Sequence, residues 1–166
     1  MFATSEALKR FWQDQRIILK PGALESELAS FETKYGVCLP EDLRSYLQTV
    51  NGFDCTEHWV TDENLITFLS LNEVKPLSEY WSEEIANAVS YFVFADYSIS
   101  AHVYAIRLSD VAAVNDVVVV YDSNLINVAN SFSGFVDGYL ANNNGVLFPQ
   151  PQAQQIVGRE RRERVS

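Results

Sequence analysis

GVCLPEDLRSYLQTVNGFD, residues 36–54, predicts a short amphipathic helix with a marked start and a marked end. Pro40 suits a first helical turn because it has no backbone N–H to leave unpaired, and the two acidic residues after it complement the helix dipole. Asn51 and Gly52 close the pattern. The apolar face recurs at three- and four-residue spacing and consists of Leu43, Tyr46, Leu47 and Val50. Such a helix needs a surface on which to bury this face.

Two further helices are predicted before this one. The first begins near Ser5, a candidate N-cap, and is stopped by Pro21 and Gly22. Its apolar positions are Leu8, Phe11, Trp12 and Leu19. The second ends at Gly36, which can adopt the left-handed conformation of a helix end. Its apolar positions are Leu24, Leu28, Phe31 and Tyr35.

The remainder of the chain changes to strand patterns. Branched and aromatic residues predict strands at residues 65–71, 91–95, 102–108 and 117–121, with the second and third forming a hairpin. Pro76 argues against a central strand at residues 72–81. A short helix is expected over residues 79–90, with Trp81, Ile85 and Val89 facing inward. A final helix follows Ser131 or Ser133 and ends near residues 142–145.

Helices first, then strands, then a helix predict an α+β fold in which N-terminal helices pack on a mainly antiparallel sheet, with a C-terminal helix. The 166 residues are 48% hydrophobic, enough for the single core of one domain, which we place at residues 1–148. Residues 149–166 form a Pro/Gln-rich and then Arg-rich tail, interpreted as a solvated end. The sequence lacks both a membrane-spanning apolar run and a secretory leader, so a cytoplasmic protein is the expectation.

The net charge and the absence of enzyme motifs limit the classes of function that the sequence supports. A net charge of -10 repels nucleic acid, but it favours encounter with a basic protein. No glycine-rich phosphate loop and no nucleophile elbow occur, so neither an enzyme nor a bound cofactor is expected. A metal site near Cys55 and His58 lacks a distant second pair of ligands. Pairing of Cys38 or Cys55 with His58 or His102 in an unrecognised hydrolase stays open.

The candidate partner-binding residues cluster after the third predicted helix. Four acidic residues lie close together there: Asp54, Glu57, Asp62 and Glu63. Phe53 and Trp59 are candidate anchors at this cluster, and Tyr97, beside Asp96 in the predicted hairpin, is another. Acidic side chains around aromatic anchors suit the binding of a basic protein, because charges steer association and aromatic residues dominate binding energy.

Four segments, in order, carry a family resemblance. They are FETKYGVCLPEDLRSYLQTVNGFD (residues 31–54), FLSLNEVKPL (68–77), YFVFADYSISAHVYAI (91–106) and SFSGFVDGYL (131–140). In the first, the matching positions are Leu39, Pro40, Asp42, Leu43, Asn51 and Gly52. From about Leu24 to Leu140 the sequence resembles the SUKH superfamily, which includes a fungal cell-wall assembly regulator and many bacterial immunity proteins.

The resemblance implies an α+β fold with a central sheet, no catalytic residues and no cofactor. It also implies a cytoplasmic immunity-type protein that neutralises a basic toxin, often a nuclease, by direct protein binding. A regulatory scaffold or adaptor of the cell-wall-regulator type is the alternative.

Overall fold

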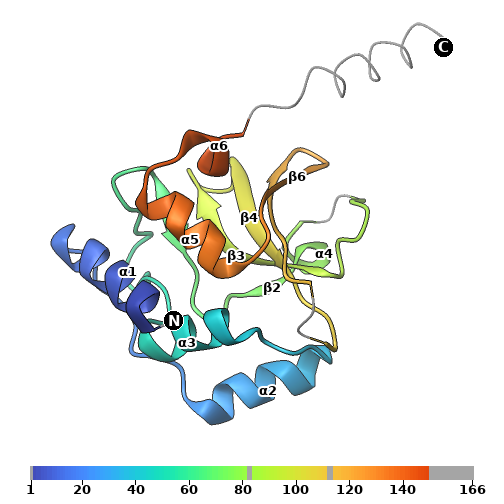
Figure 1. The fold of residues 1–166 in the computed structure, drawn as a ribbon, viewed down its shortest axis with the longest axis horizontal. Helices are drawn as coiled ribbons and strands as arrows, with labels where there is room; N and C mark the ends of the chain where they lie inside the picture. Colours follow the sequence, from blue (N-terminus) through green and yellow to red (C-terminus); the bar gives the residue numbers. More distant parts are fainter. Residues whose placement is uncertain (1, 82–83, 112–113, 150–166) are drawn as a thin grey trace, which may run out of the picture.

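The sheet of the computed structural model is antiparallel throughout and is built around the predicted hairpin (Figure 1). β3 (Tyr91–Tyr97) pairs with β4 (His102–Arg107), and the sheet continues through β5 (Val117–Tyr121) to β6 (Asn124–Ala129). On the other side of β3 lie β1 (Ile66–Phe68) and the two-residue β2 (Lys75–Pro76), which both pair with it. The structure describes residues 2–81, 84–111 and 114–149.

The central strands are covered on both faces. β3, β4 and β5 are buried along almost their whole length. Because successive side chains of a strand point to opposite faces, unbroken burial requires packing on both sides of the sheet. These strands therefore form the middle of the core and explain the long runs of apolar residues at 91–95 and 117–120.

Three helices form one packed group beside the sheet: α1 (Phe2–Asp14), α3 (Glu41–Thr49) and α5 (Phe132–Leu140). Trp12 of α1 is fully buried, with ring centroids 4.8 Å from Phe68 and 5.0 Å from Phe53. Phe135 of α5 packs on Phe94 and Tyr104 of the central strands. Aromatic rings from helices and strands thus interlock in the core, at separations typical of edge-to-face pairs.

The remaining helices lie around this core. α2 (Glu25–Tyr35) packs through Phe31 on Phe92 of the sheet, and Gly36 ends it in the left-handed conformation as predicted. α4 (Leu77–Tyr80) follows β2, and α6 (Asn144–Leu147) follows α5. None of the helices in the described part of the chain is long and apolar enough to cross a membrane.

The stretch that predicted α3 is confirmed, with two adjustments. Leu43, Tyr46, Leu47 and Val50 are all buried. Pro40 is the residue before the helix, in extended conformation, rather than part of its first turn. The helix ends at Thr49, so Asn51 and Gly52 act beyond it. The Oδ1 atom of Asn51 accepts a hydrogen bond from the backbone N–H of Leu71 at 2.7 Å and ties this segment to the chain after β1.

Gly52 is required by two constraints. Its φ of +73° favours glycine, and a Cβ atom there would lie 2.5 Å from the carbonyl carbon of Leu69. The backbone N–H of the next residue, Phe53, donates to the carbonyl of Phe68 at 2.9 Å. Gly52 therefore lets its backbone approach that of Leu69 closely. This contact fixes the position of Phe53, where the next segment begins.

Two predicted helices are wrong in extent. α1 ends at Asp14 instead of continuing to Leu19, which forms a β-bridge with Phe53, and Ser5 is buried inside the helix rather than capping it. The backbone between them turns at Arg16, whose φ is +61°. The helix expected over residues 79–90 does not form, and α4 and a turn replace it. The backbone hydrogen bonds of the described residues in this range close short turns. Ile85 is buried, but Val89 is 71% exposed.

Three elements were not predicted. β2 is a two-residue strand that includes Pro76 and pairs with β3, within the segment where no central strand was expected. β6 alternates polar and apolar residues too irregularly for a strand signal, but it pairs with β5 through a two-residue turn. α6 is a single turn capped by Asn143. The C-terminal helix is confirmed as α5, with Ser131 as its N-cap accepting from the backbone N–H of Gly134 at 3.0 Å. The predicted tail, residues 149–166, lies almost wholly outside the described residues.

Candidate protein-binding site

The acidic loop, residues 54–64, lies beside the chain that leaves α1 (Figure 1). Phe53, directly before the loop, is fully buried against Trp12 and forms a β-bridge with Leu19. The backbone N–H of Asp54 donates to the carbonyl of Ile18 at 2.8 Å, and the N–H of Glu63 donates to the Gln15 side chain at 2.9 Å. The core therefore holds both ends of the loop.

A groove of about 480 Å³ opens between this loop and residues 15–18. One wall consists of Gln15, Arg16, Ile17 and Ile18, and the other of Asp54, Thr56, Glu57, His58, Val60 and Thr61. Ile18 is 70% exposed, so the groove combines an apolar side chain with carboxylates. Such a lining suits a basic side chain that also brings an apolar stem.

The groove carries two carboxylates, those of Asp54 and Glu57. Hydrogen bonds from the Thr56 hydroxyl, at 2.5 Å, and from the Thr56 backbone N–H, at 3.0 Å, hold the pKa of Asp54 below its ordinary value. Asp54 is therefore ionised at neutral pH. Glu57 is exposed on the same wall, and Arg16 contributes one opposite charge from the other wall.

Four of the predicted binding residues are accessible from solvent at or beside this groove. Glu57, Trp59 and Glu63 are exposed, with Trp59 at 40%, and Asp54 is half-buried. Asp54 and Glu57 line the groove itself. The structure thus brings together a carboxylate pair and leaves an aromatic side chain available near them.

Asp62 does not belong to this surface, because it is 4% exposed. Its Oδ1 accepts from the backbone N–H groups of Asn64 at 2.8 Å and of Ile66 at 2.9 Å, and its Oδ2 accepts from the Tyr139 hydroxyl. Tyr139 in turn accepts from Trp12 Nε1 at 2.8 Å. Asp62 therefore anchors the loop to α1 and α5 instead of facing a partner.

Asp96 is also buried, at 1% exposed, and closes the turn of the β3–β4 hairpin. It accepts from the Tyr80 hydroxyl at 2.7 Å and from the backbone N–H of Ser100 at 2.8 Å. Burial raises the pKa of Tyr80 to about 12. Tyr97 is half-buried and stacks on His102 at 4.5 Å. Tyr97 pairs with Ile66, so the hairpin end does lie next to the end of the acidic loop.

Two of the four side chains in the hydrolase alternative, Cys55 and His102, lie in surroundings that disfavour catalysis. Burial raises the pKa of the Cys55 thiol, which disfavours the thiolate that acts as a nucleophile. His102 is 3% exposed, its Nε2 lies 3.1 Å from the Tyr104 hydroxyl, and burial lowers its pKa to about 4. Within residues 2–81, 84–111 and 114–149, no group of three or more His, Cys, Asp or Glu side chains is placed to hold a metal ion.

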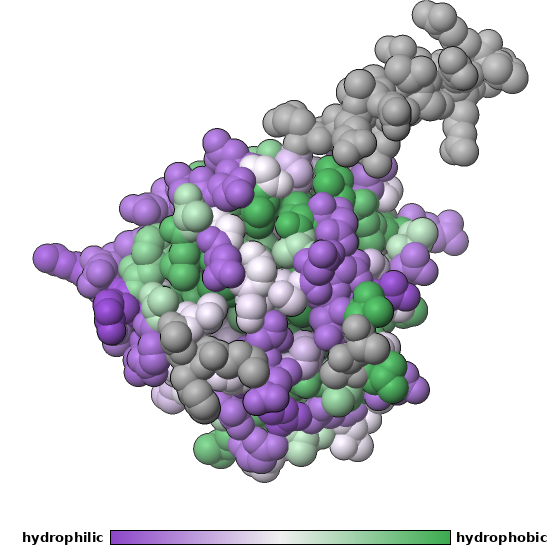
Figure 2. All heavy atoms as spheres, viewed as in Figure 1, coloured by the Kyte–Doolittle hydropathy of each residue, from purple (hydrophilic) through white to green (hydrophobic). Residues whose placement is uncertain are grey.

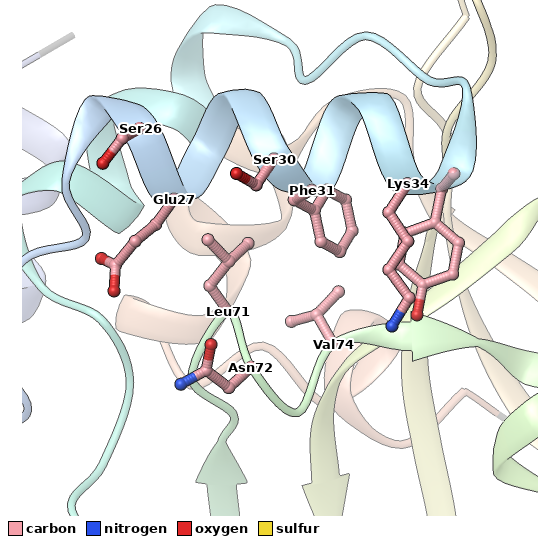
Figure 3. A pocket seen from close by; sticks show the side chains of 9 residues that line it. Ser26, Glu27, Ser30, Phe31, Lys34, Leu71, Asn72 and Val74 are labelled. Carbon is pink, nitrogen blue, oxygen red and sulfur yellow. The ribbon is translucent and has the colours of Figure 1, made fainter.

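A second hollow, the α2 groove, has a different character (Figure 3). It holds about 340 Å³ between α2 and the connection from β1 to β2. Its floor is apolar and consists of Phe31, Leu71 and Val74, all buried, whereas Glu27 and Lys34 stand at its two ends. Glu27 and Lys34 give this groove one charge of each sign, whereas Asp54 and Glu57 give the acidic groove two carboxylates.

The family model described as the SMI1 / KNR4 family (SUKH-1) matches residues 22–138. The chain belongs to the SMI1/KNR4 family. The match runs from just before α2 into α5, and it therefore includes the acidic loop and the whole sheet. A search of curated proteins finds no match. Membership in the SMI1/KNR4 family agrees with a role in binding other proteins and with the observed α+β fold.

Sequence reasoning missed one wall of the acidic groove. Arg16 and Ile18 belonged to a predicted helix, where no pairing with Asp54 was expected. One signal in the sequence does indicate the end of α1: the polar pair Gln15 and Arg16 interrupts its apolar spacing. The β-bridge between Leu19 and Phe53, together with the hydrogen bonds from Asp54 to Ile18 and from Glu63 to Gln15, brings this wall to the loop.

Proposed function

We propose that this protein is a cytoplasmic, non-enzymatic immunity-type protein that neutralises a basic toxin domain, such as a nuclease, by covering its active surface. The observation that carries this proposal is the acidic groove, in which the carboxylates of Asp54 and Glu57 face an exposed Ile18. A nuclease must present basic residues to bind phosphate, so an acidic inhibitor can compete for the same surface.

The electrostatics of the whole chain support the same partner class. The net charge is -10. Figure 2, which shows hydropathy and not the sign of charge, shows hydrophilic residues interspersed with apolar ones over the face that contains α5 and β6. An acidic protein of this kind associates faster with a basic partner and more slowly with nucleic acid. Because the loop is tied to the core by Asp62 and Phe53, little ordering is needed when a partner binds.

The test is co-expression with the toxin encoded beside the gene, with survival of the host and isolation of the complex as readouts. Rescue together with a stable complex is the expected result. The decisive variant is Glu57→Lys with Glu63→Lys, since both side chains are exposed. Its matched control is Glu6→Lys with Glu79→Lys, which changes the net charge equally at exposed positions on α1 and α4.

We expect the acidic-loop variant to associate about tenfold more slowly at low salt, with a weaker salt dependence, and the control to change little. Equal effects of both pairs would mean that only net charge matters. No rescue and no complex with the wild-type protein would contradict the proposal itself.

An adaptor of the cell-wall-regulator type is the second candidate. It is favoured by the α2 groove, which shares no lining residue with the acidic groove and so offers a separate surface. Affinity capture that returns several housekeeping proteins, lost on Lys34→Glu but retained on Glu57→Lys, would favour this function over toxin neutralisation.

A further inference from the structure

Two exposed aliphatic residues, Leu65 and Ile99, stand on neighbouring turns at one end of the sheet. Leu65 is 49% exposed and Ile99 is 75% exposed. The backbone N–H of Ser98 donates to the carbonyl of Leu65 at 2.9 Å, next to the pair of Ile66 with Tyr97. We propose that these two side chains, here called the aliphatic tip, are the apolar contact between this protein and a basic partner protein. The proposal rests on the proposed function and names the surface that would fill a pocket on the partner.

The backbone at both residues is strained. Leu65 has a φ of +65°, and residues 98–100 have φ values of +48°, +55° and +64°. Residues other than Gly, Asn and Asp adopt this left-handed conformation at a cost of about 1 kcal/mol or more each. Ile99 is an outlier because its side chain branches at Cβ. Folding alone would favour glycine or asparagine at these positions. Strain that persists in a fold concentrates where a protein binds or acts.

Two buried carboxylates hold these turns in place. Asp62 accepts from the backbone N–H groups of Asn64 and Ile66, on either side of Leu65, and its carbonyl accepts from the Leu65 N–H at 3.1 Å. Asp96 does the same for the second turn through the N–H of Ser100 at 2.8 Å. Asp62 and Asp96 therefore act as positioning residues. Each gives its turn a fixed shape in which an apolar side chain points into solvent.

The surroundings of the tip favour a basic protein as its occupant. Glu63 is exposed and lies two residues before Leu65, so the acidic loop reaches the aliphatic tip. An aliphatic side chain with an acidic residue two positions away fits an apolar pocket that lysine or arginine side chains surround, because buried apolar anchors supply binding energy and flanking charges steer the approach. A second copy of this chain is a poor occupant, since both surfaces would carry the same charge.

The test is the double variant Leu65→Asn with Ile99→Asn. Asparagine tolerates the left-handed region, so we expect an unfolding temperature equal to or above that of the wild type. Affinity for the toxin encoded beside the gene, measured by calorimetry, should fall about tenfold or more. Val89→Asn is the matched control, because Val89 is a 71% exposed aliphatic residue elsewhere on the surface, and it should leave the affinity unchanged.

Two results would overturn the proposal. An unfolding temperature that falls by several degrees in the double variant would mean that Leu65 and Ile99 serve the fold. Unchanged affinity would mean that the partner docks elsewhere. If the wild-type protein does not bind the toxin, the proposed function fails. The tip can then still be tested in cells with the photo-reactive residue p-benzoylphenylalanine, placed at position 99 and, for comparison, at position 89. An adduct with a basic protein at position 99 alone, lost with Leu65→Asn, supports it, and equal labelling at both positions refutes it.

Discussion

Replacing Asp62 by alanine should destabilise the protein strongly, although this residue lies in a loop that also carries exposed charges. Asp62 is 4% exposed and its carboxylate accepts three hydrogen bonds, from the backbone of Asn64 and Ile66 and from the Tyr139 hydroxyl. A residue that only attracted a partner would be dispensable for folding. The stability of Asp62→Ala therefore separates the two roles.

The size of the effect follows from the donors left behind. The Ile66 N–H and the Tyr139 hydroxyl belong to buried residues, and each buried donor without a partner costs about 1–3 kcal/mol. The Asn64 N–H is half-buried and adds less. We expect Asp62→Ala to lower the free energy of unfolding by about 3–5 kcal/mol, allowing for relief of the buried charge. Asp62→Asn retains one acceptor oxygen and should lose about half as much.

Urea denaturation followed by tryptophan fluorescence is a suitable assay, because Trp12 donates to Tyr139 in the same network. Glu63→Ala is the matched control. Glu63 is the exposed neighbour in the same loop, and its removal should change stability by less than about 0.5 kcal/mol. If Asp62→Ala lost no more than Glu63→Ala, the assignment of Asp62 as an anchor would be refuted.

Three further changes test the fold. Leu47→Ala should cost about 2–5 kcal/mol in urea denaturation, because Leu47 is 2% exposed, and a loss below about 1 kcal/mol would contradict its place in the core. Gly52→Ala should lower the unfolding temperature much more than Gly36→Ala does. Both glycines have a positive φ, but only at Gly52 would a Cβ atom meet neighbouring backbone. Equal losses would count against the close approach of the Gly52 and Leu69 backbones. His102 has a folded pKa of about 4 against an ordinary 6.5, so its contribution to stability is complete above pH 6.5 and is lost as the pH falls toward 4, when the unfolded chain takes up the proton. In urea titrations between these pH values His102→Phe should flatten that loss whereas exposed His58→Gln should not, and identical pH profiles would refute the argument.

The fold was largely predictable because its signals are local. The apolar spacing of α2 and α3, the unbroken apolar runs of β3 and β5, and the Ser131 cap each depend on residues close together in the chain. The misplaced end of α1 has a tertiary cause. Leu19 continues a helical spacing, but it is drawn into a β-bridge with Phe53. β6 also depends on pairing, since its own sequence has no regular alternation.

The candidate site was predictable only in part. The acidic cluster is visible in the sequence, and Glu57, Trp59 and Glu63 are exposed as a binding surface requires. The opposite wall of the groove and the aliphatic tip could not be found in this way. Neither Leu65 nor Ile99 is a residue type that indicates a left-handed turn, so no local pattern marks them.

The sequence by itself determined the order of α1, α2, α3, β1, β3, β4, β5 and α5, the apolar faces that form the core and a net charge of -10 that disfavours nucleic acid. Tertiary structure alone decided which carboxylates are available to a partner. Asp62 and Glu63 are neighbours of the same chemical type, yet Asp62 is buried because a hydroxyl 77 residues away, on Tyr139, reaches it. A carboxylate is buried only where donors compensate for its lost hydration. Two of the donors to Asp62 are local, on Asn64 and Ile66, but the third, on Tyr139, comes from a segment that only folding brings to it.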